Sequence, residues 1–475
     1  MLFGIHQKAF HWKIDNLKKE YYMFDLIIIG GGPAGYVAAE RAGSKGLKVV
    51  LFEKKTMGGV CLNEGCIPTK ALLYSAKMYE HALEGEQFGI LADNVSFDYG
   101  KMVARKNKLV RKLVGGVKMK MKSNKVEVVE GEAVLESRSD EGVVVSCNGE
   151  KYTGKNVLIS TGSEASVPPI PGLEEAGDVI LTNREILEMK ERPESLVVIG
   201  GGVIGMEFAC FYQGLGTQVT VVEMLPEILG GLDGEVSAMV RDYFAKKGID
   251  FHLQAKVTKV DGNKVTFEKD GKSETVEGEK ILLSVGRRPV TKGVGLENLN
   301  IELDRGGIKV DEKMRTNVAN VFAAGDVTGF SLLAHTASRE GEVVVNNLTG
   351  GDDVMSYKAI PGVVYITPEV AGVGETEETA KEKGLAYKTA KLPMTYAGRF
   401  AIENERFSGF CKVLIGEKYG EILGVHMFGN PSSDMIYGAC LAIEQEMTLE
   451  EMKKVVFPHP TVSEIFKEVI FSEFK

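Results

Sequence analysis

Short runs of hydrophobic residues recur along the chain, and two of them lead directly into glycine-rich turns. Residues 26–29 and residues 196–199 are too short for a helix and are typical of strands buried on both faces of a parallel sheet. Each run is followed by a Gly-x-Gly-x-x-Gly turn, and a second hydrophobic run, at 49–52 or 219–222, ends at a glutamate. The pattern predicts two strand–turn–helix–strand units of the dinucleotide-binding type, whose turns begin 170 residues apart.

Both turns carry the residue types that hold a pyrophosphate. The first glycine makes the turn, the second lets the phosphates approach, and the third lets the helix pack on the strand, while the helix N-terminus favours an anion. The glycines are Gly30, Gly32 and Gly35 in the first unit and Gly200, Gly202 and Gly205 in the second. Glu53 and Glu223, each 18 residues after the last glycine, are expected to accept hydrogen bonds from ribose hydroxyls. Because a carboxylate at Glu223 repels a 2′-phosphate and no arginine follows it closely, the second unit favours NAD over NADP.

A pair of cysteines lies just beyond the first unit. Cys61 follows the last glycine by 26 residues, and Cys66 comes five residues later. Such a pair beside a nucleotide site suggests that electrons pass between a disulfide and a bound cofactor, and two nucleotide units suggest a relay between two cofactors. A buried structural pair or half of a zinc site are the alternatives. We expect no metal, because the sequence has no second cysteine-rich cluster to complete four zinc ligands.

Three further hydrophobic runs end in small residues. Residues 157–163 and 281–287 bracket the second unit and contain Gly162 and Gly286, so they are expected to carry the chain into and out of it. A third run ends at Asp326, whose carboxylate could hold a polyol hydroxyl or could instead cap the next helix. The last 120 or so residues contain no nucleotide motif and are typical of mixed strands and helices.

Composition excludes several other classes of protein. The 475 residues suggest about three domains. A formal charge of −9 without a long basic block argues against nucleic acid as a main partner. No run of 18 hydrophobic residues appears, so neither a transmembrane helix nor a membrane partner is expected. Six cysteines in a chain of this length are no secreted disulfide framework, and we expect a cytoplasmic protein.

Residues 1–22 precede Met23 and the first predicted strand, and they do not match the pattern that follows. They lack the hydrophobic centre of a signal peptide and the Arg and Ser bias of a transit peptide. We expect a disordered N-terminal extension, or the product of an upstream start that is not normally used.

Taken together, these motifs resemble the flavin-dependent disulfide reductases (class I pyridine nucleotide-disulfide oxidoreductases), and within them the dihydrolipoamide dehydrogenases. The resemblance covers about residues 23–475, nearly the whole chain. It is carried by the two glycine fingerprints, by Cys61-Leu62-Asn63-Glu64-Gly65-Cys66-Ile67-Pro68-Thr69-Lys70, by Glu207 and Glu223, by Gly325-Asp326, by Leu333-Ala334-His335 and by His459-Pro460-Thr461-Val462-Ser463-Glu464.

The resemblance implies an α/β fold with two Rossmann-like dinucleotide-binding domains and a C-terminal α+β dimerisation domain. The implied FAD domain comprises residues 23–153 and 283–352, the NAD domain 154–282, and the interface domain 353–475 of a homodimer. The implied cofactor-binding residues are the fingerprint glycines with Glu53, Lys70, Gly162, Asp326 and Ala334 for FAD, and with Glu223 and Gly286 for NAD.

The resemblance also implies the chemistry. Dihydrolipoamide would reduce a Cys61–Cys66 disulfide, with electrons passing through FAD to NAD⁺. Cys61 would exchange with substrate, and Cys66 would face the flavin. Lys70, paired with Glu207, would lie beside the flavin N5 edge. His459 of a second copy would serve as acid and base, oriented by Glu464.

The implied partners are lipoyl domains or the lipoyl carrier protein of 2-oxo acid dehydrogenase or glycine cleavage complexes. The alternative is another FAD-dependent disulfide reductase that uses NADH, and a second alternative is a non-catalytic scaffold subunit. The chain departs from the family pattern at Phe457, where a histidine is common, at Val60 directly before the thiols, and at Glu64 between them.

Overall fold

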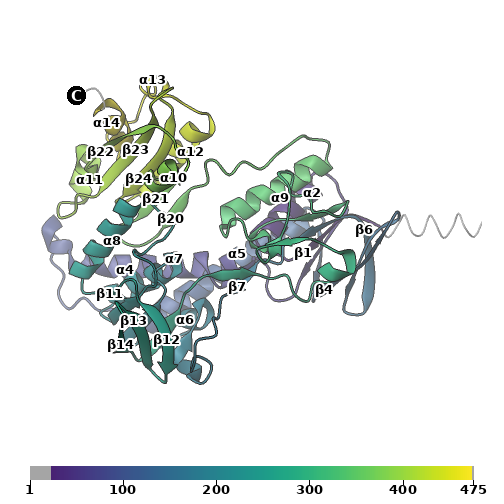
Figure 1. Cartoon of the computed structure of the whole chain (residues 1–475), viewed down its shortest axis with the longest axis horizontal. Coiled ribbons are helices and arrows are strands. Elements are labelled where there is room, and N and C mark those ends of the chain that lie inside the picture. Colours follow the sequence, from purple (N-terminus) through teal and green to yellow (C-terminus); the bar gives the residue numbers. More distant parts are fainter. Residues whose placement is uncertain (1–22, 473–475) are drawn as a thin grey trace, which may run out of the picture. The chain divides into compact units, whose positions relative to one another are not determined.

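The computed structural model describes residues 23–472, which form two compact units (Figure 1). The first contains the residues up to Pro68, Asn107–Glu164 and Arg287–Met355, and the second contains Thr69–Lys106, Ala165–Gly286 and the residues from Ser356 onward. The predicted extension, residues 1–22, lies outside the described part of the chain. The predicted α/β fold is confirmed, since parallel sheets with helices alternate along the first 350 residues and an antiparallel sheet follows.

The first unit is built on a sheet with the strand order β3-β2-β1-β6-β5-β4, in which β19 also pairs with β6. Its strands are β1 (Phe24–Ile29), β2 (Val49–Glu53), β3 (Glu127–Glu130), β4 (Ala133–Ser139), β5 (Gly142–Cys147), β6 (Glu150–Ile159) and β19 (Val321–Ala323). The strands around β1 are parallel, and β4, β5 and β6 form an antiparallel meander. Both strands predicted from hydrophobic runs in this unit, within β1 and β2, are therefore confirmed.

Burial explains why β1 lies at the centre of this sheet. Leu26, Ile27 and Ile28 are fully buried, and burying such a side chain stabilises the folded state by about 1.5–3 kcal/mol relative to leaving it exposed. Helix α2 (Pro33–Ser44) follows β1 and packs against α9 (Ala334–Leu348) so closely that a Cβ on Gly341 would meet the Ala34 carbonyl oxygen at 2.6 Å. This contact holds α2, and therefore the first glycine turn, against the rest of the unit.

The second unit contains the second nucleotide fold. Its parallel sheet has the order β11-β10-β9-β15-β8. The elements are β8 (Ile180–Leu181), α6 (Asn183–Leu187), β9 (Ser195–Ile199), α7 (Val203–Gly214), β10 (Gln218–Val222), α8 (Gly234–Lys246), β11 (Asp250–His252) and β15 (Lys280–Leu283). A three-stranded antiparallel sheet, β12 (Lys256–Asp261), β13 (Lys264–Lys269) and β14 (Lys272–Glu277), is inserted before β15. The strands predicted at 196–199 and 219–222 are thus confirmed.

The C-terminal part of the second unit is an antiparallel sheet with the order β20-β21-β24-β23-β22, with helices packed on it (Figure 1). Its elements are β20 (Gly362–Val364), β21 (Val370–Gly374), α10 (Glu377–Glu382), β22 (Tyr387–Leu392), α11 (Gly398–Glu403), β23 (Phe410–Gly416), β24 (Ile422–Phe428), α12 (Ser432–Glu444), α13 (Leu449–Met452) and α14 (Glu464–Ser472). This arrangement agrees with the predicted α+β domain.

The remaining elements connect these sheets. They are α3 (Gly59–Asn63), α4 (Cys66–Leu83), η1 (Gly85–Phe88), α5 (Tyr99–Ser123), β7 (Ser163–Ala165), η2 (Gly177–Val179), β16 (Arg287–Pro289), η3 (Leu296–Leu299), β17 (Leu303–Asp304), β18 (Gly307–Ile308), η4 (Asp326–Thr328) and η5 (Met394–Tyr396). In the second unit, Leu72, Leu73 and Ala76 of α4 join a hydrophobic core with the buried face of α7. None of the helices formed by residues 23–472 is long and apolar enough to cross a membrane.

A buried lysine joins the two parts of the second unit. Lys412, in the middle of β23, is 2% exposed, and its ammonium lies 2.7 Å from Asp233, 3.2 Å from Glu235 and 2.8 Å from Glu377. Burial alone would lower the pKa of Lys412, but the three carboxylates raise it above its ordinary value. Since Asp233 caps α8 and is itself fully buried, Lys412 connects the nucleotide fold to the C-terminal sheet.

Replacing this lysine is therefore expected to destabilise the protein strongly. Lys412→Met leaves the Asp233 carboxylate buried without its cation, which typically costs about 3–5 kcal/mol. The matched control is Lys391→Met, because Lys391 binds Glu235 at the surface, where an ion pair contributes about 1 kcal/mol or less. The stability of the two variants is compared by urea unfolding, monitored by circular dichroism. Equal midpoints for the two variants would contradict the role of Lys412 as the buried cation of this cluster.

Candidate active site

The first glycine turn has a geometry that only glycine permits. Gly30 has φ +107°, and a Cβ on it would lie 2.2 Å from the Ser160 carbonyl oxygen. A Cβ on Gly35 would lie 1.9 Å from the Gly30 carbonyl oxygen, so the turn folds back on itself at the start of α2. Gly32 is the N-cap of α2 and no side chain caps it, which leaves backbone N–H groups available to an anion.

The second glycine turn repeats these contacts in the second unit. Gly200 has φ +100°, and a Cβ on it would lie 2.6 Å from the Ser284 carbonyl oxygen. A Cβ on Gly205 would lie 2.1 Å from the Gly200 carbonyl oxygen, and Gly202 is again an N-cap without a side-chain partner. The two predicted nucleotide turns therefore have the same local structure.

Each turn is closed by its predicted glutamate. The Gly31 N–H donates to Glu53 Oε2 at 2.8 Å, and the Gly201 N–H donates to Glu223 Oε2 at 2.6 Å. The other oxygen of each carboxylate accepts from a backbone N–H two residues later, that of Lys55 or of Leu225, at 2.7 Å in both cases. Both carboxylates are thus held at the ends of their strands, where a ribose would lie beside a pyrophosphate on the turn.

Two serines complete this repeat, and the sequence analysis did not single them out. Ser160 Oγ donates to the Gly30 carbonyl at 2.9 Å, and Ser284 Oγ donates to the Gly200 carbonyl at 2.8 Å. The signal was present, because both bracketing segments read Ser-x-Gly after their hydrophobic run, at Gly162 and at Gly286. These two glycines have φ +74° and +113°, so both segments bend sharply after the serine.

Asp326 is held by a hydrogen-bond network of the first unit. Ser163 Oγ donates to Asp326 Oδ2 at 2.5 Å, and Arg287 donates to the hydroxyl and the carbonyl of Ser163, both at 2.7 Å. Burial raises the pKa of Asp326, against the opposing effects of Ser163 and Arg287. The N-cap of η4 is Gly325, and no side chain caps this helix, so the capping alternative for Asp326 is not what the structure shows.

The two cysteines lie in consecutive helices. Cys61 is the middle residue of α3, and Cys66 is the first residue of α4. Both side chains are half-buried. A thiolate at a helix N-terminus is favoured by the free backbone N–H groups and the helix dipole. Burial, and then the charges of Cys61 and Cys66, raise the pKa of the Tyr36 phenol, so Tyr36 of α2, which the sequence analysis missed, lies within electrostatic range of both thiols.

Lys70 and Glu207 form an ion pair in the second unit. The Lys70 ammonium donates to both oxygens of Glu207 at 2.8 Å, and the Glu207 side chain is 4% exposed. Glu207 is the fifth residue of α7 and lies beyond its first turn, so the helix dipole is not its main partner. The predicted pairing of these two residues is therefore present, one helical turn after Cys66 along α4.

Tyr365 completes this pair, and no sequence motif pointed to it. Its backbone N–H donates to Glu207 Oε1 at 3.0 Å, and the Lys70 ammonium lies 4.6 Å from the centre of its ring. Tyr365 directly follows β20, so only the three-dimensional fold brings it to residues almost 160 and 300 positions earlier.

His459 and Glu464 form the second predicted pair. His459 Nδ1 lies 3.0 Å and 3.1 Å from the two Glu464 oxygens, and the Thr461 N–H donates to Glu464 Oε2 at 3.0 Å. The Thr461 N–H, and then His459, lower the pKa of Glu464, so this carboxylate stays ionised. The imidazole side chain is 78% exposed, which leaves it accessible to a substrate or to a second copy of the chain.

Two other predicted positions have simpler surroundings. Ala334 is the first residue of α9, whose N-cap is Leu333 without a side-chain cap, so backbone N–H groups are available there. Phe457, where the family commonly has a histidine, packs edge-on against Phe466 of α14 at 6.5 Å between ring centres.

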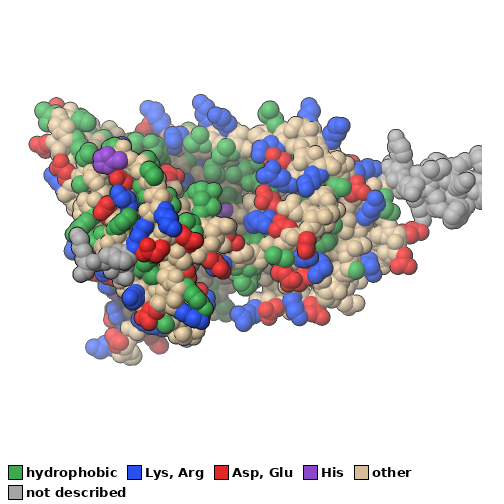
Figure 2. All heavy atoms as spheres, turned by 90° about the horizontal axis from the view of Figure 1, so that it is seen from above, with side chains coloured by type: hydrophobic (Ala, Val, Ile, Leu, Met, Phe, Trp, Pro, Cys, Tyr) green, Lys and Arg blue, Asp and Glu red, His purple; other side chains and the backbone are tan. Residues whose placement is uncertain are grey.

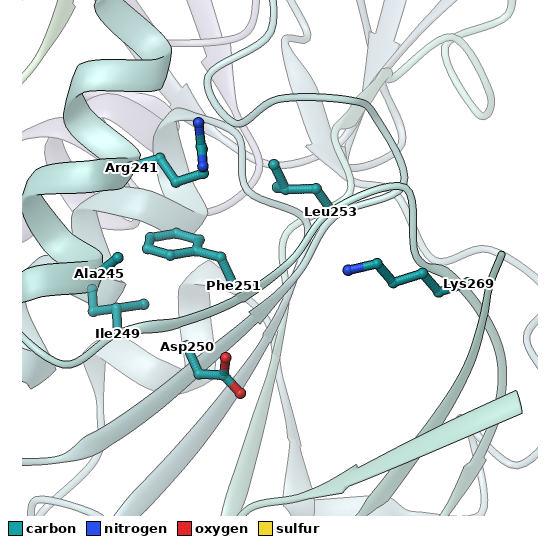
Figure 3. A pocket seen from close by; sticks show the side chains of 7 residues that line it. All are labelled: Arg241, Ala245, Ile249, Asp250, Phe251, Leu253 and Lys269. Carbon is teal, nitrogen blue, oxygen red and sulfur yellow. The ribbon is translucent and has the colours of Figure 1, made fainter. Parts of the chain in front are cut away.

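A shallow depression of about 510 Å³ beside β11 is lined by Arg241, Ala245, Ile249, Asp250, Phe251, Leu253 and Lys269 (Figure 3). It contains none of the predicted site residues.

Known proteins match nearly the whole chain. The profile described as "Pyridine nucleotide-disulphide oxidoreductase" matches residues 24–341, and that of the dimerisation domain of the same family matches residues 360–470. The dihydrolipoyl dehydrogenase of Geobacillus stearothermophilus is 40% identical over 94% of this chain and 95% of its own, and one from Bacillus subtilis is 42% identical over the same shares. The human mitochondrial dihydrolipoyl dehydrogenase is 40% identical over 94% of this chain and 89% of its own.

Solved structures agree with this assignment. LpdA from Mycobacterium tuberculosis has a TM-score of 0.86 at 26% identity and covers 94% of this chain and 99% of its own. The HOCl-induced flavoprotein disulfide reductase RclA from Escherichia coli has a TM-score of 0.83 at 26% identity, with coverage of 94% and 99%. The resemblance stated from the motifs is therefore confirmed: this chain belongs to the pyridine nucleotide-disulphide oxidoreductase family.

Proposed function

We propose that this chain reoxidises protein-bound dihydrolipoamide through a Cys61–Cys66 disulfide and FAD, with NAD⁺ as the final acceptor. The observation that carries the proposal is the thiol pair, with Cys61 within α3 and Cys66 at the start of α4, in the unit that also contains a complete dinucleotide turn. Dihydrolipoyl dehydrogenases about 40% identical over nearly the full chain support the same activity.

The residues present fit both cofactors. In the first unit, the tight turn at Gly30, the uncapped start of α2 and Glu53 suit the pyrophosphate and ribose of FAD, and Asp326 and the start of α9 offer polar groups for the rest of it. Gly200, Gly202, Gly205 and Glu223 suit NAD, with Gly286 at the adjoining bend, as Gly162 is at the bend beside the first turn. FAD supplies a ring that accepts two electrons from a dithiol and returns them as a hydride to NAD⁺.

The protein groups perform the thiol chemistry. A substrate thiolate attacks Cys61 Sγ, the Cys61–Cys66 bond breaks, and Cys66 leaves as a thiolate that the start of α4 stabilises. The second substrate thiolate then displaces Cys61 and forms the substrate disulfide, so that the substrate loses two electrons and two protons. His459 from a second copy takes one of these protons, and the other protonates the departing Cys61 sulfur. Glu464 holds the His459 ring and stabilises the imidazolium. Lys70, Glu207 and Tyr365 would order the groups around the flavin.

The homodimer and lipoyl-bearing partners fit the dimerisation domain and the named relatives. We propose the lipoyl domains or carrier protein of a 2-oxo acid dehydrogenase or glycine cleavage complex as substrate carriers, and the cytoplasm as the location. We also retain as proposals the boundaries 23–153 with 283–352 for the FAD domain, 154–282 for the NAD domain and 353–475 for the interface domain. The alternative, another NADH-using disulfide reductase, is favoured only by the likeness to RclA at lower identity.

A direct assay tests the activity. The purified protein is expected to reduce NAD⁺ with dihydrolipoamide and to be inactive with glutathione disulfide and NADPH. Cys61→Ser should abolish lipoamide turnover while FAD stays bound, and His459→Gln should lower the rate about 10²–10⁴-fold through loss of acid–base help. Turnover retained by Cys61→Ser, or a near-normal rate for His459→Gln, would refute these roles.

Coenzyme choice tests Glu223. Because its carboxylate is fixed by Gly201 and Leu225, a 2′-phosphate would meet a negative charge that cannot move away. NADPH should therefore serve far worse than NADH, and Glu223→Gln, which keeps the size but removes the charge, should narrow the ratio of the two kcat/KM values. Equal use of both coenzymes by the unaltered protein would overturn this explanation.

Tyr365 is expected to act as a positioning residue for Lys70. Tyr365→Leu removes the ring beside the ammonium but keeps the backbone N–H to Glu207, while Tyr365→Phe keeps both. A cation–π contact of about 0.5–2 kcal/mol predicts flavin reduction by NADH slowed by up to about thirtyfold in the leucine variant only. Stopped-flow absorbance measures this step separately from thiol exchange with lipoamide. Equal rates in the two variants would mean that the ring has no positioning effect.

A further inference from the structure

Helix α5 has a charge pattern unlike the rest of the chain. It contains nine basic residues and no acidic residue, in a chain whose formal charge is −9. The basic residues are Lys101, Arg105, Lys106, Lys108, Arg111, Lys112, Lys118, Lys120 and Lys122. On the face of the molecule drawn in Figure 2, by contrast, positive and negative side chains are interspersed.

About half of these cations have partners within the protein. Lys106 is buried and donates to the Leu187 carbonyl and to Glu188, and Arg105 donates to the Ala71 carbonyl of α4 at 2.9 Å. Lys101, Lys118 and Lys120 pair with Asp98, Glu130 and Glu40 at 3.5, 3.6 and 3.1 Å. These contacts explain five of the nine positions.

The other four cations face solvent. Lys108, Arg111, Lys112 and Lys122 are exposed, and none has an ion pair with any residue between 23 and 472. At 100° per residue they fall on an arc about 100° wide, and at 1.5 Å per residue they span roughly 21 Å of the helix. All four belong to the first unit, which also contains Cys61 and Cys66.

The same arc contains a glycine and an exposed methionine. A Cβ on Gly115, or on the adjacent Gly116, would have no heavy atom within 4 Å, so no packing within the described chain requires these helix-weakening residues. Met119 is 73% exposed. Like charges four apart, such as Lys108 and Lys112, also weaken a helix. The basic face of α5, defined as Lys108, Arg111, Lys112, Gly115, Met119 and Lys122, thus has features that an internal role does not explain.

The chemistry of this face fits an acidic protein better than a nucleic acid. A flexible methionine and a bare stretch of backbone among cations suit a protein surface that approaches closely. The face has no aromatic side chain on which a base could stack. The first turns of α5 pack on α4, the helix that Cys66 begins, and the basic residues continue along the same helix from Lys108.

We propose that the basic face of α5 docks the acidic surface of the protein domain that carries the dithiol substrate. This inference rests on the proposed function and names where the carrier, rather than its lipoyl group, is recognised. Charges arranged in this way accelerate encounter more than they strengthen the final complex, and salt screens them.

Charge reversal tests the proposal with two substrates. The oxidation of free dihydrolipoamide is compared with that of an acidic lipoyl domain carrying the dihydrolipoyl group, at low and high salt. Lys108→Glu/Lys112→Glu should lower kcat/KM for the domain about tenfold or more at low salt, leave free dihydrolipoamide unchanged, and lose its effect at high salt. Lys108→Gln/Lys112→Gln should give a smaller loss in the same direction.

The matched control is Lys151→Glu/Lys292→Glu, which reverses two exposed lysines elsewhere in the first unit. An equal loss in this control, or no loss in the α5 variant, overturns the docking site. A loss that coincides with dissociation of the dimer in sedimentation would assign the face to a second copy instead, and loss of RNA binding with normal carrier turnover would assign it to a nucleic acid. Either result overturns the proposal. Failure of the unaltered protein to oxidise free dihydrolipoamide would instead refute the proposed function.

Discussion

The close approach of a glycine turn to a neighbouring strand is the constraint on which both nucleotide sites depend. At Gly30 and Gly200, the backbone passes so near the Ser160 and Ser284 carbonyls that no Cβ fits. Because of this close approach, the end of a strand, the start of a helix and the side chain of a glutamate meet at one point. The free N–H groups of the helix start face outward from it. The serine hydroxyls then fasten the turn to the next strand. In both sites the N–H groups that face an anion belong to the backbone, and the same two side-chain types, a glutamate and a serine, hold the turn.

The local parts of this design could be predicted from the sequence. The runs that became β1, β2, β9 and β10 are short and hydrophobic, and they end at a glycine turn or at a glutamate. Their local pattern therefore agrees with the structure that the whole chain forms. The roles of the fingerprint glycines and the position of each glutamate follow from the same local spacing. The family followed from motifs that recur at fixed places along the chain, and the comparisons confirm it.

The pairings that join distant segments could not be predicted in this way. Nothing near Tyr365 indicates that its N–H will meet Glu207, and nothing near Arg287 indicates that it will hold Ser163 against Asp326. The ion cluster around Lys412 likewise requires α8, α10 and β23 to be brought together. The basic face of α5 was missed for another reason. Hydrophobic residues interrupt its cations, so the sequence contains no contiguous basic block, and only the helix gathers them on one side.

The proposed activity requires two electrons to travel between the thiol pair and NAD through a bound flavin. The most direct measurement is to add one equivalent of NADH to the oxidised, flavin-containing protein without oxygen, alkylate the thiols that form and locate them by mass spectrometry. Each NADH consumed is expected to expose two thiols, those of Cys61 and Cys66. Oxidation of NADH that exposes no thiols, or that labels other cysteines instead, would contradict it.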